Sequence, residues 1–132
     1  MTSRRTTVLA GALAALLATS GTIHLVRPRV YEPLIPRRLG SPRAWVVGSG
    51  VAELGCAAAL ALPRTRRAGA VATAALLVGV FPGNVQMALD AHPGARSWAR
   101  KPAVAWGRLP LQVPLVAAAC AVARDTSARV SG

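Results

Sequence analysis

Four long apolar stretches, nearly free of charge, constrain what this chain can fold into more than any other feature. They cover residues 7–26, 44–62, 68–89 and 103–123, and arginine bounds each of them. A helix of about 20 residues crosses a hydrocarbon core of about 30 Å. None of the stretches keeps the polar/apolar period of a surface helix along its whole length. We therefore predict an all-α membrane protein, a four-transmembrane-helix bundle in which residues 1–132 form a single domain.

The composition of these stretches also argues against a water-soluble core. The chain is 53% hydrophobic but has only one Phe, one Tyr and three Trp among its 132 residues. A soluble core of this size normally uses more aromatic volume. In lipid, a helix satisfies its own backbone hydrogen bonds, so Ala-, Leu-, Val- and Gly-rich segments are sufficient.

The positive charge is segregated into the gaps between the apolar stretches. Sixteen Lys and Arg face only four Asp and Glu. Nucleic-acid binding would require a basic folded face and a recognisable reading module, and neither is present. Arginine between spans is instead expected at the headgroup level, where it anchors helix ends and attracts anionic lipid. The predicted partner is the lipid bilayer, not nucleic acid.

The N-terminal stretch has two interpretations. A basic start, an apolar run and the small residues Ala18 and Ser20 resemble a signal peptide, and Arg4-Arg5 resembles a twin-arginine signal. The apolar run continues past any plausible cleavage site, which favours an uncleaved first helix. Basic residues are almost evenly divided between the two sides, but the tight basic turn at 63–67 favours both termini in the cytoplasm.

Polar residues at membrane depth are the candidate functional residues. They lie near the ends of the first and third stretches, in the middle of the second and in the first half of the fourth: His24, Glu53, Asn84, Arg108 and Gln112. Because successive helices cross in opposite directions, all of these positions fall in the same half of the bilayer. The sequence therefore predicts one polar pocket or structural cluster drawn from all four helices.

Charges inside a bilayer are costly and are expected to face the bundle interior and find partners. Glu53 and Arg108 are predicted to pair with each other. Asn84 and Gln86 point to different faces of one helix, and Asn84 is the one expected to join the cluster. A buried ion pair that only joins helices is the alternative to a functional site.

The connection at 27–43 holds four prolines with apolar residues between its charges, which predicts a Pro-rich interfacial loop between the first two helices. The aromatic residues Tyr31, Trp45, Trp98 and Trp106 fall on this same side. They are expected to form an aromatic belt at the headgroup level.

Packing features are also visible in the spans. Repeats of small residues at intervals of four, at Gly48 and Ala52 and at Gly11 and Ala15, predict faces for close helix approach. Three prolines inside the spans are expected to bend their helices: Pro82, Pro110 and Pro114.

The sequence offers no catalytic or metal-binding set. Cys56 and Cys120 both lie within spans, with no C-x-x-C pair and no zinc-like spacing, so they are expected to be small buried thiols. No nucleophile–base arrangement is visible. We predict no catalytic residues, no metal and no enzymatic activity for the chain on its own.

Several ordered motifs resemble those of the DoxX-like family of small bacterial integral membrane proteins. They are G-T-I-H-L-V-R-P-R-V-Y-E-P-L-I-P (Gly21 to Pro36), S-G-V-A-E-L-G (Ser49 to Gly55), P-R-T-R-R (Pro63 to Arg67), V-F-P-G-N-V-Q-M (Val80 to Met87) and R-L-P-L-Q (Arg108 to Gln112). The likeness extends from about Gly11 to about Ala123. It implies a four-helix protein of the bacterial inner membrane with cytoplasmic termini, and the five candidate polar residues match the family's motif positions.

The resemblance also implies a class of function. The family name comes from a subunit associated with thiosulfate:quinone oxidoreductase, and some relatives are linked to oxidative-stress complexes. We therefore expect an accessory or quinone/lipid-binding subunit of a membrane redox system, with an oxidoreductase subunit as partner. No cofactor is evident in the sequence, although a quinone is compatible with it. A small transporter or proton-coupled carrier and a non-catalytic membrane scaffold are the alternative functions. A second copy of the chain, in a homo-oligomer, is a further candidate partner.

Overall fold

A computed structural model describes residues 2–35 and 37–131 of the chain. Met1 and Gly132, the ends of the predicted domain, and Pro36, in the predicted Pro-rich loop, lie outside the described residues. Within the described ranges, four long α-helices account for most of the chain: α1 (Thr2–Val26), α2 (Pro42–Ala61), α3 (Arg66–Leu89) and α4 (Pro102–Val130). Short 3-10 turns lie between them: η1 (Pro28–Val30), η2 (Glu32–Leu34), η3 (Arg37–Leu39) and η4 (Trp98–Arg100).

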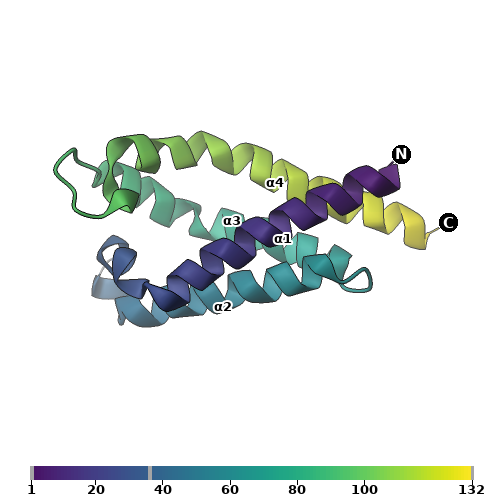
Figure 1. Cartoon of the computed structure of the whole chain (residues 1–132), viewed down its shortest axis with the longest axis horizontal. Coiled ribbons are helices and arrows are strands. Elements are labelled where there is room, and N and C mark those ends of the chain that lie inside the picture. The colour runs from purple at the N-terminus through teal and green to yellow at the C-terminus, as the bar shows by residue number, and fades with distance from the viewer. Residues whose placement is uncertain (1, 36, 132) are drawn as a thin grey trace.

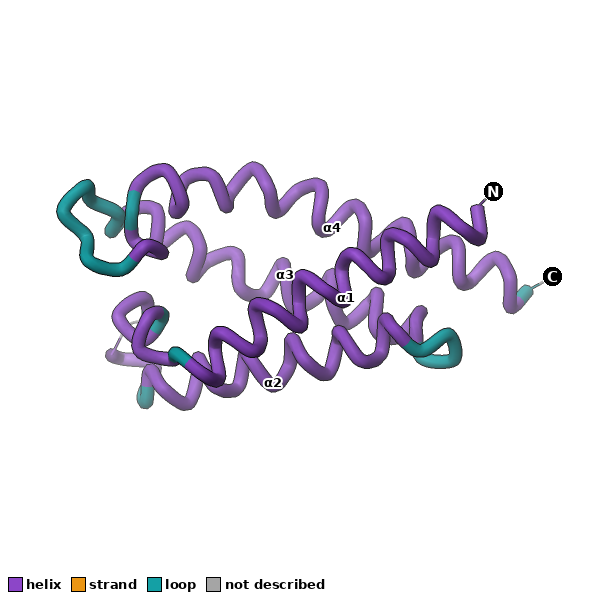
Figure 2. The backbone as a smooth tube through the Cα atoms, viewed as in Figure 1, coloured by secondary structure: helices purple, strands orange, loops and turns teal. Residues whose placement is uncertain are grey.

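The four helices form an up-and-down bundle (Figure 1). Helix α1 packs against α2 and α4, and α3 packs against the same two helices. Both chain ends lie at one end of the bundle, together with the short α2–α3 turn, whereas the two longer connections lie at the other (Figure 2). We call these the terminal end and the loop end.

The helices agree with the predicted stretches but are longer at several ends. The largest difference is in α4, which continues past Ala123 to Val130. This extension is polar and lies beyond the apolar stretch, so hydropathy alone gave no reason to include it. At the other end of the chain, Thr6 donates a hydrogen bond from Oγ1 to Asp125 Oδ2 at 2.8 Å, which joins α1 to the extension of α4.

The buried apolar residues form two clusters. The terminal core consists of aliphatic and small side chains from all four helices: Ala10, Leu13, Leu17, Cys56, Ala57, Leu60, Ala70, Ala119 and Val122. The loop core includes residues from the connections as well as the helices: Tyr31, Leu34, Val46, Met87, Ala88, Ala99 and Ala105. Cys56 is a free buried thiol in the terminal core, as the sequence predicted, whereas Cys120 is partly exposed.

Close backbone approach occurs at different glycines from those predicted. A Cβ atom added at Gly11 or Gly48 would meet nothing within 4 Å, so the prediction that these small faces form the helix contacts is wrong. A Cβ at Gly21 of α1 would instead lie 2.8 Å from the carbonyl oxygen of Gly50 in α2. Small-residue spacing recurs by chance in Ala-rich helices, and only the crossing point of α1 and α2 determines which glycines touch.

The outer surface of the bundle is apolar. Large hydrophobic side chains are exposed on all four helices, among them Val8, Val51, Val78, Phe81 and Val113. Between 17% and 28% of each apolar span is buried within the bundle. Among the described residues, these four helices are long and apolar enough to cross a membrane.

Candidate ligand-binding cavity

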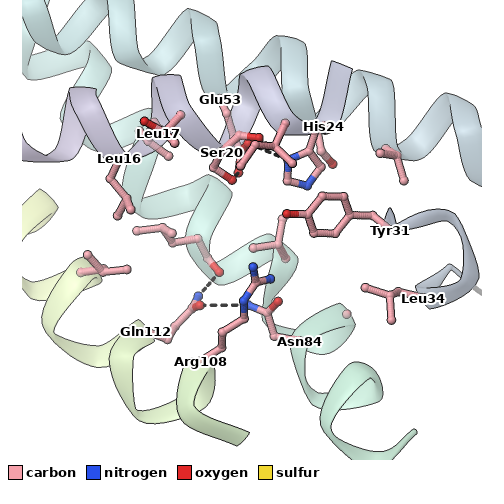
Figure 3. A pocket seen from close by; sticks show the side chains of 18 of the residues that line it. Leu16, Leu17, Ser20, His24, Tyr31, Leu34, Glu53, Asn84, Arg108 and Gln112 are labelled. Carbon is pink, nitrogen blue, oxygen red and sulfur yellow. Dashed lines mark hydrogen bonds and ion pairs between the residues drawn. The ribbon is translucent and has the colours of Figure 1, made fainter. Parts of the chain in front are cut away.

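A cavity of about 380 Å³ lies between the terminal core and the loop core. Leu17 of the terminal core and Leu34 and Val46 of the loop core are among its lining residues. All four helices contribute to the wall, most of which is apolar. The predicted polar residues all line this one space: His24, Glu53, Asn84, Arg108 and Gln112 (Figure 3).

His24 and Glu53 are in contact in the wall of the cavity. The His24 Nδ1 atom lies 3.2 Å from Glu53 Oε2, and both side chains are about 15% exposed. Ser20, one turn earlier in α1, donates from Oγ to the other carboxylate oxygen of Glu53 at 3.1 Å. The Glu53 carboxylate is therefore held by two groups from α1.

The close crossing of α1 and α2 accounts for this pair. Gly21 and Gly50 lie at the crossing point, and His24 and Glu53 each follow one turn later on their helices. A Cβ atom at Gly50 would lie 2.9 Å from the Cβ of His24. Because side chains three residues apart share a helix face, the glycine contact brings the imidazole and the carboxylate together.

Tyr31 is a cavity residue that the sequence placed elsewhere. It is 5% exposed and stacks on the His24 ring, with centroids 4.1 Å apart and planes within 6° of parallel. The prediction that Tyr31 belongs to a headgroup belt is therefore wrong, whereas Trp45, Trp98 and Trp106 are about half exposed. The loop that carries Tyr31 folds back through 3-10 turns into the bundle, since Tyr31 and Leu34 gain burial there.

Arg108 does not pair with Glu53. Within 4.0 Å, among the described residues, Glu53 contacts His24 and not Arg108, so the predicted Glu53–Arg108 pair is wrong. The Arg108 guanidinium instead lies 5.9 Å from the Tyr31 ring centroid and 5.6 Å from that of Trp98. These are cation–π distances. Trp98, like Tyr31, lies in a connection between helices. It is therefore not among the polar residues of the apolar spans from which the site was predicted.

Asn84 and Gln112 link α3 to α4 on the opposite wall. Asn84 Nδ2 donates to Gln112 Oε1 at 3.2 Å, and Gln112 Nε2 donates to the Leu77 carbonyl. Gln86 lies on the exposed side, where it donates to Asp90 Oδ2 at 3.0 Å. The prediction that Asn84, and not Gln86, joins the cluster is confirmed.

The cavity reaches the outer surface of the bundle, because some of its lining residues are exposed. Leu16 of α1 and Leu111 of α4 both line it, and they are 44% and 57% exposed. The two helices diverge from the terminal end toward the loop end (Figure 1). A polar interior therefore opens directly onto the apolar outside of the bundle.

The cavity supplies hydrogen-bonding and charged groups but no metal site. Among the described residues, no three His, Cys, Asp or Glu side chains are grouped so that they could hold a metal ion. The donors and acceptors that remain for a ligand are those of His24, Glu53, Arg108 and Asn84. Such a set, in apolar walls, fits an organic molecule with a small polar head.

Comparison with known proteins places the chain in a family. Neither the curated proteins nor the solved structures include a match. One family model matches residues 13–123, which include the cavity and most of the four helices. Its description carries no activity. The chain therefore belongs to the family described as Domain of unknown function (DUF8561).

Proposed function

We propose that this protein crosses a membrane four times and binds a membrane-dissolved amphiphile in its cavity. The exposed apolar side chains on every helix support the first part, because so large an apolar surface is not stable in water. In a bilayer, the same surface is solvated by lipid tails. The bacterial inner membrane and cytoplasmic termini remain parts of this proposal.

The observation that carries the ligand proposal is the side opening at Leu16 and Leu111. Through it, a head group could reach Arg108 and His24 while its apolar tail stayed outside among the lipid chains. A volume of about 380 Å³ is within the range of small-molecule sites and suits a head group better than a whole lipid. A quinone or a lipid fits this description.

We further propose that binding serves a membrane redox system, with the protein as an accessory subunit. The support is the resemblance to DoxX-like proteins, which the family match leaves untested, together with a cavity that has aromatic and hydrogen-bonding walls. As an accessory subunit, the protein would act together with a partner oxidoreductase and the bound quinone, which would carry the redox chemistry.

Transport across the membrane is supported less well by the geometry. A carrier needs alternate access from both sides, whereas the terminal core closes the cavity toward the terminal end. Leu60 and Val122 there are fully buried. If Glu53→Gln abolished a flux through the reconstituted protein, the carrier would replace the binding subunit as the preferred function.

The proposed function is tested by what co-purifies with the intact protein from its native membrane in mild detergent. We expect a quinone or lipid, identified by mass spectrometry after solvent extraction, to be lost from a Glu53→Gln, Arg108→Gln double variant. The matched control is Asp90→Asn with Arg96→Gln, which changes exposed residues outside the cavity. Equal amounts of bound molecule in both variants would refute the cavity as the site.

A structural scaffold makes the opposite prediction. If Glu53 and Arg108 served only to join helices, then replacing both with apolar residues would preserve folding and phenotype. Retention of the co-purifying oxidoreductase by this apolar variant, with no bound amphiphile in the wild type, would favour the scaffold.

A further inference from the structure

The hydrogen bonds of His24 determine which of its ring nitrogens faces a ligand. Nδ1 lies 2.7 Å from the backbone carbonyl oxygen of Ser20. A carbonyl oxygen only accepts hydrogen bonds, so Nδ1 must carry the hydrogen. In the neutral ring, Nε2 is then an unprotonated acceptor.

The ring is held in this orientation from several sides. The Glu53 carboxylate lies 3.2 Å from the same Nδ1 atom, and the Tyr31 ring lies flat against the imidazole. Nε2 is on the side of the ring turned away from Ser20 and Glu53 (Figure 3). No described residue makes a hydrogen bond to Nε2, and His24 lines the cavity. The α1 wall therefore presents a hydrogen-bond acceptor.

The α4 wall presents the opposite character. Arg108 is always protonated and has only donors, and it extends into the cavity from the side across from His24 (Figure 3). Its neighbours are the Tyr31 and Trp98 rings, and no described carboxylate lies within 4.0 Å of it. A head group that satisfies both walls must donate to His24 and offer an oxygen to Arg108.

We propose that the cavity selects the reduced, hydroquinone form of a lipophilic quinone. The carbonyl oxygens of a quinone only accept hydrogen bonds. A quinone carbonyl beside Nε2 would therefore place two acceptors against each other, with no hydrogen between them. A hydroquinone has two hydroxyls on opposite sides of a flat ring, each of which can donate and accept. This inference rests on the proposed function, because it assumes that an amphiphile occupies the cavity, and it assigns the ligand's redox state and its contact with His24.

The test compares two forms of one probe. The protein in nanodiscs of phosphatidylcholine and phosphatidylglycerol is titrated with decylubiquinone and, under argon, with decylubiquinol. We expect the wild type to bind the reduced probe about tenfold more tightly, the difference that one hydrogen bond makes. Monooleoylglycerol, which has hydroxyls but no ring, should compete weakly, since the aromatic wall favours a flat head group.

The matched variants are His24→Asn and His92→Asn. In His24→Asn, the amide nitrogen can replace Nδ1 as the donor to Ser20, but nothing replaces Nε2. The preference for the reduced probe should fall to about twofold or less, while binding of the oxidised probe persists. His92 is exposed on the loop after α3, and its variant should keep the full preference.

A wild-type measurement decides the question if His24→Asn does not fold. Acidification protonates Nε2 and turns it into a donor, so the preference should shift toward the oxidised probe as pH falls. Glu53, Tyr31 and Arg108 are the titratable or charged side chains that face the ring. A preference that stayed constant with pH would refute the role of Nε2.

The outcomes separate this inference from the proposed function. Binding of neither probe would overturn this inference but not the proposed function, which a lipid head group also satisfies. Equal affinity for the two probes, or tighter binding of the oxidised one at neutral pH, would overturn only the selection of the reduced form. Equal competition by monooleoylglycerol would overturn the assignment of a ring-shaped head group.

Discussion

The half of the bundle at the terminal end and the half at the loop end, here the terminal half and the loop half, hold the same four helices together by different interactions. The terminal core is aliphatic and tightly closed, with Ala10, Leu60 and Val122 fully buried. Its polar side chains are satisfied internally, as when Thr73 donates to the Gly69 carbonyl at 2.7 Å. The loop half instead surrounds a cavity of about 380 Å³ with charged, amide and aromatic groups.

The difference indicates that, in this small chain, one half of the bundle provides most of the stability and the other half provides the binding site. A void gives up the dispersion contacts that close packing provides, and charges away from water are costly unless paired. Around its cavity, the loop half both lacks these dispersion contacts and keeps charged groups away from water. The closed terminal half holds the helices while the other half stays open, as expected where binding is favoured over stability.

The largest expected effect contrasts two leucines, one from each half. Leu60→Ala removes a fully buried side chain from the terminal core and should lower the free energy of unfolding by about 4 kcal/mol, whereas Leu34→Ala, beside an existing cavity, should cost about 2 kcal/mol. Thermal unfolding in detergent, followed by a dye that reacts with the buried Cys56 thiol in a Cys120→Ala background, measures both. Leu62→Ala, at an exposed position, is the control. Equal losses at Leu60 and Leu34 would remove the distinction between the halves.

The contact between Gly21 and Gly50, which joins α1 to α2 beside the cavity, gives the second test. Gly21→Ala places a Cβ atom 2.8 Å from the Gly50 carbonyl oxygen, so α1 and α2 must separate, at a cost of about 2 kcal/mol. The separation should also break the His24–Glu53 pair and weaken probe binding. Gly11→Ala, which meets nothing within 4 Å, should be neutral or slightly stabilising in the same unfolding assay. An unchanged free energy of unfolding in Gly21→Ala would contradict the proposed positioning of His24 against Glu53.

The third test asks how much the charge of Glu53 contributes to the stability of the loop half. Glu53→Gln keeps an acceptor for Ser20 but removes the negative charge beside His24, and should lower the free energy of unfolding by about 1.5 kcal/mol. Denaturant unfolding in mixed micelles checks this value. Asp90→Asn, in an exposed contact with Gln86, should change it by less than about 0.5 kcal/mol. A more stable Glu53→Gln variant would show that the charge of the Glu53 carboxylate lowers stability and is kept for function.

The sequence was sufficient to predict the four helices and the gathering of their polar residues. Helix length and hydropathy determine the four apolar helices, and alternating direction brings His24, Glu53, Asn84 and Arg108 to one half of the bundle. These are properties of single helices and of their order. They do not depend on how the helices rotate against one another.

Pairing within the site could not be predicted in the same way. Which side chain Glu53 meets depends on the crossing of α1 and α2 at Gly21 and Gly50, a contact that no spacing rule singles out. Tyr31 and Trp98 reach the cavity region from connections, whose 3-10 turns have no apolar period. Tyr31, an aromatic residue within the run of prolines that follows His24, was the one available signal.

The smallest expected effect concerns the polar contact of the terminal half. Thr6→Val removes the hydrogen bond to Asp125 and should cost about 1 kcal/mol, with no effect on probe binding because Thr6 lies far along α1 from the cavity residues. The α4 extension should exchange its amide hydrogens faster, which hydrogen–deuterium exchange mass spectrometry can measure. Thr126→Val removes only a bond to Val122 within α4 and is the matched control. If Thr6→Val weakened probe binding as much as Gly21→Ala, the two halves would be energetically coupled, and the closed terminal half would have to be regarded as part of the binding site.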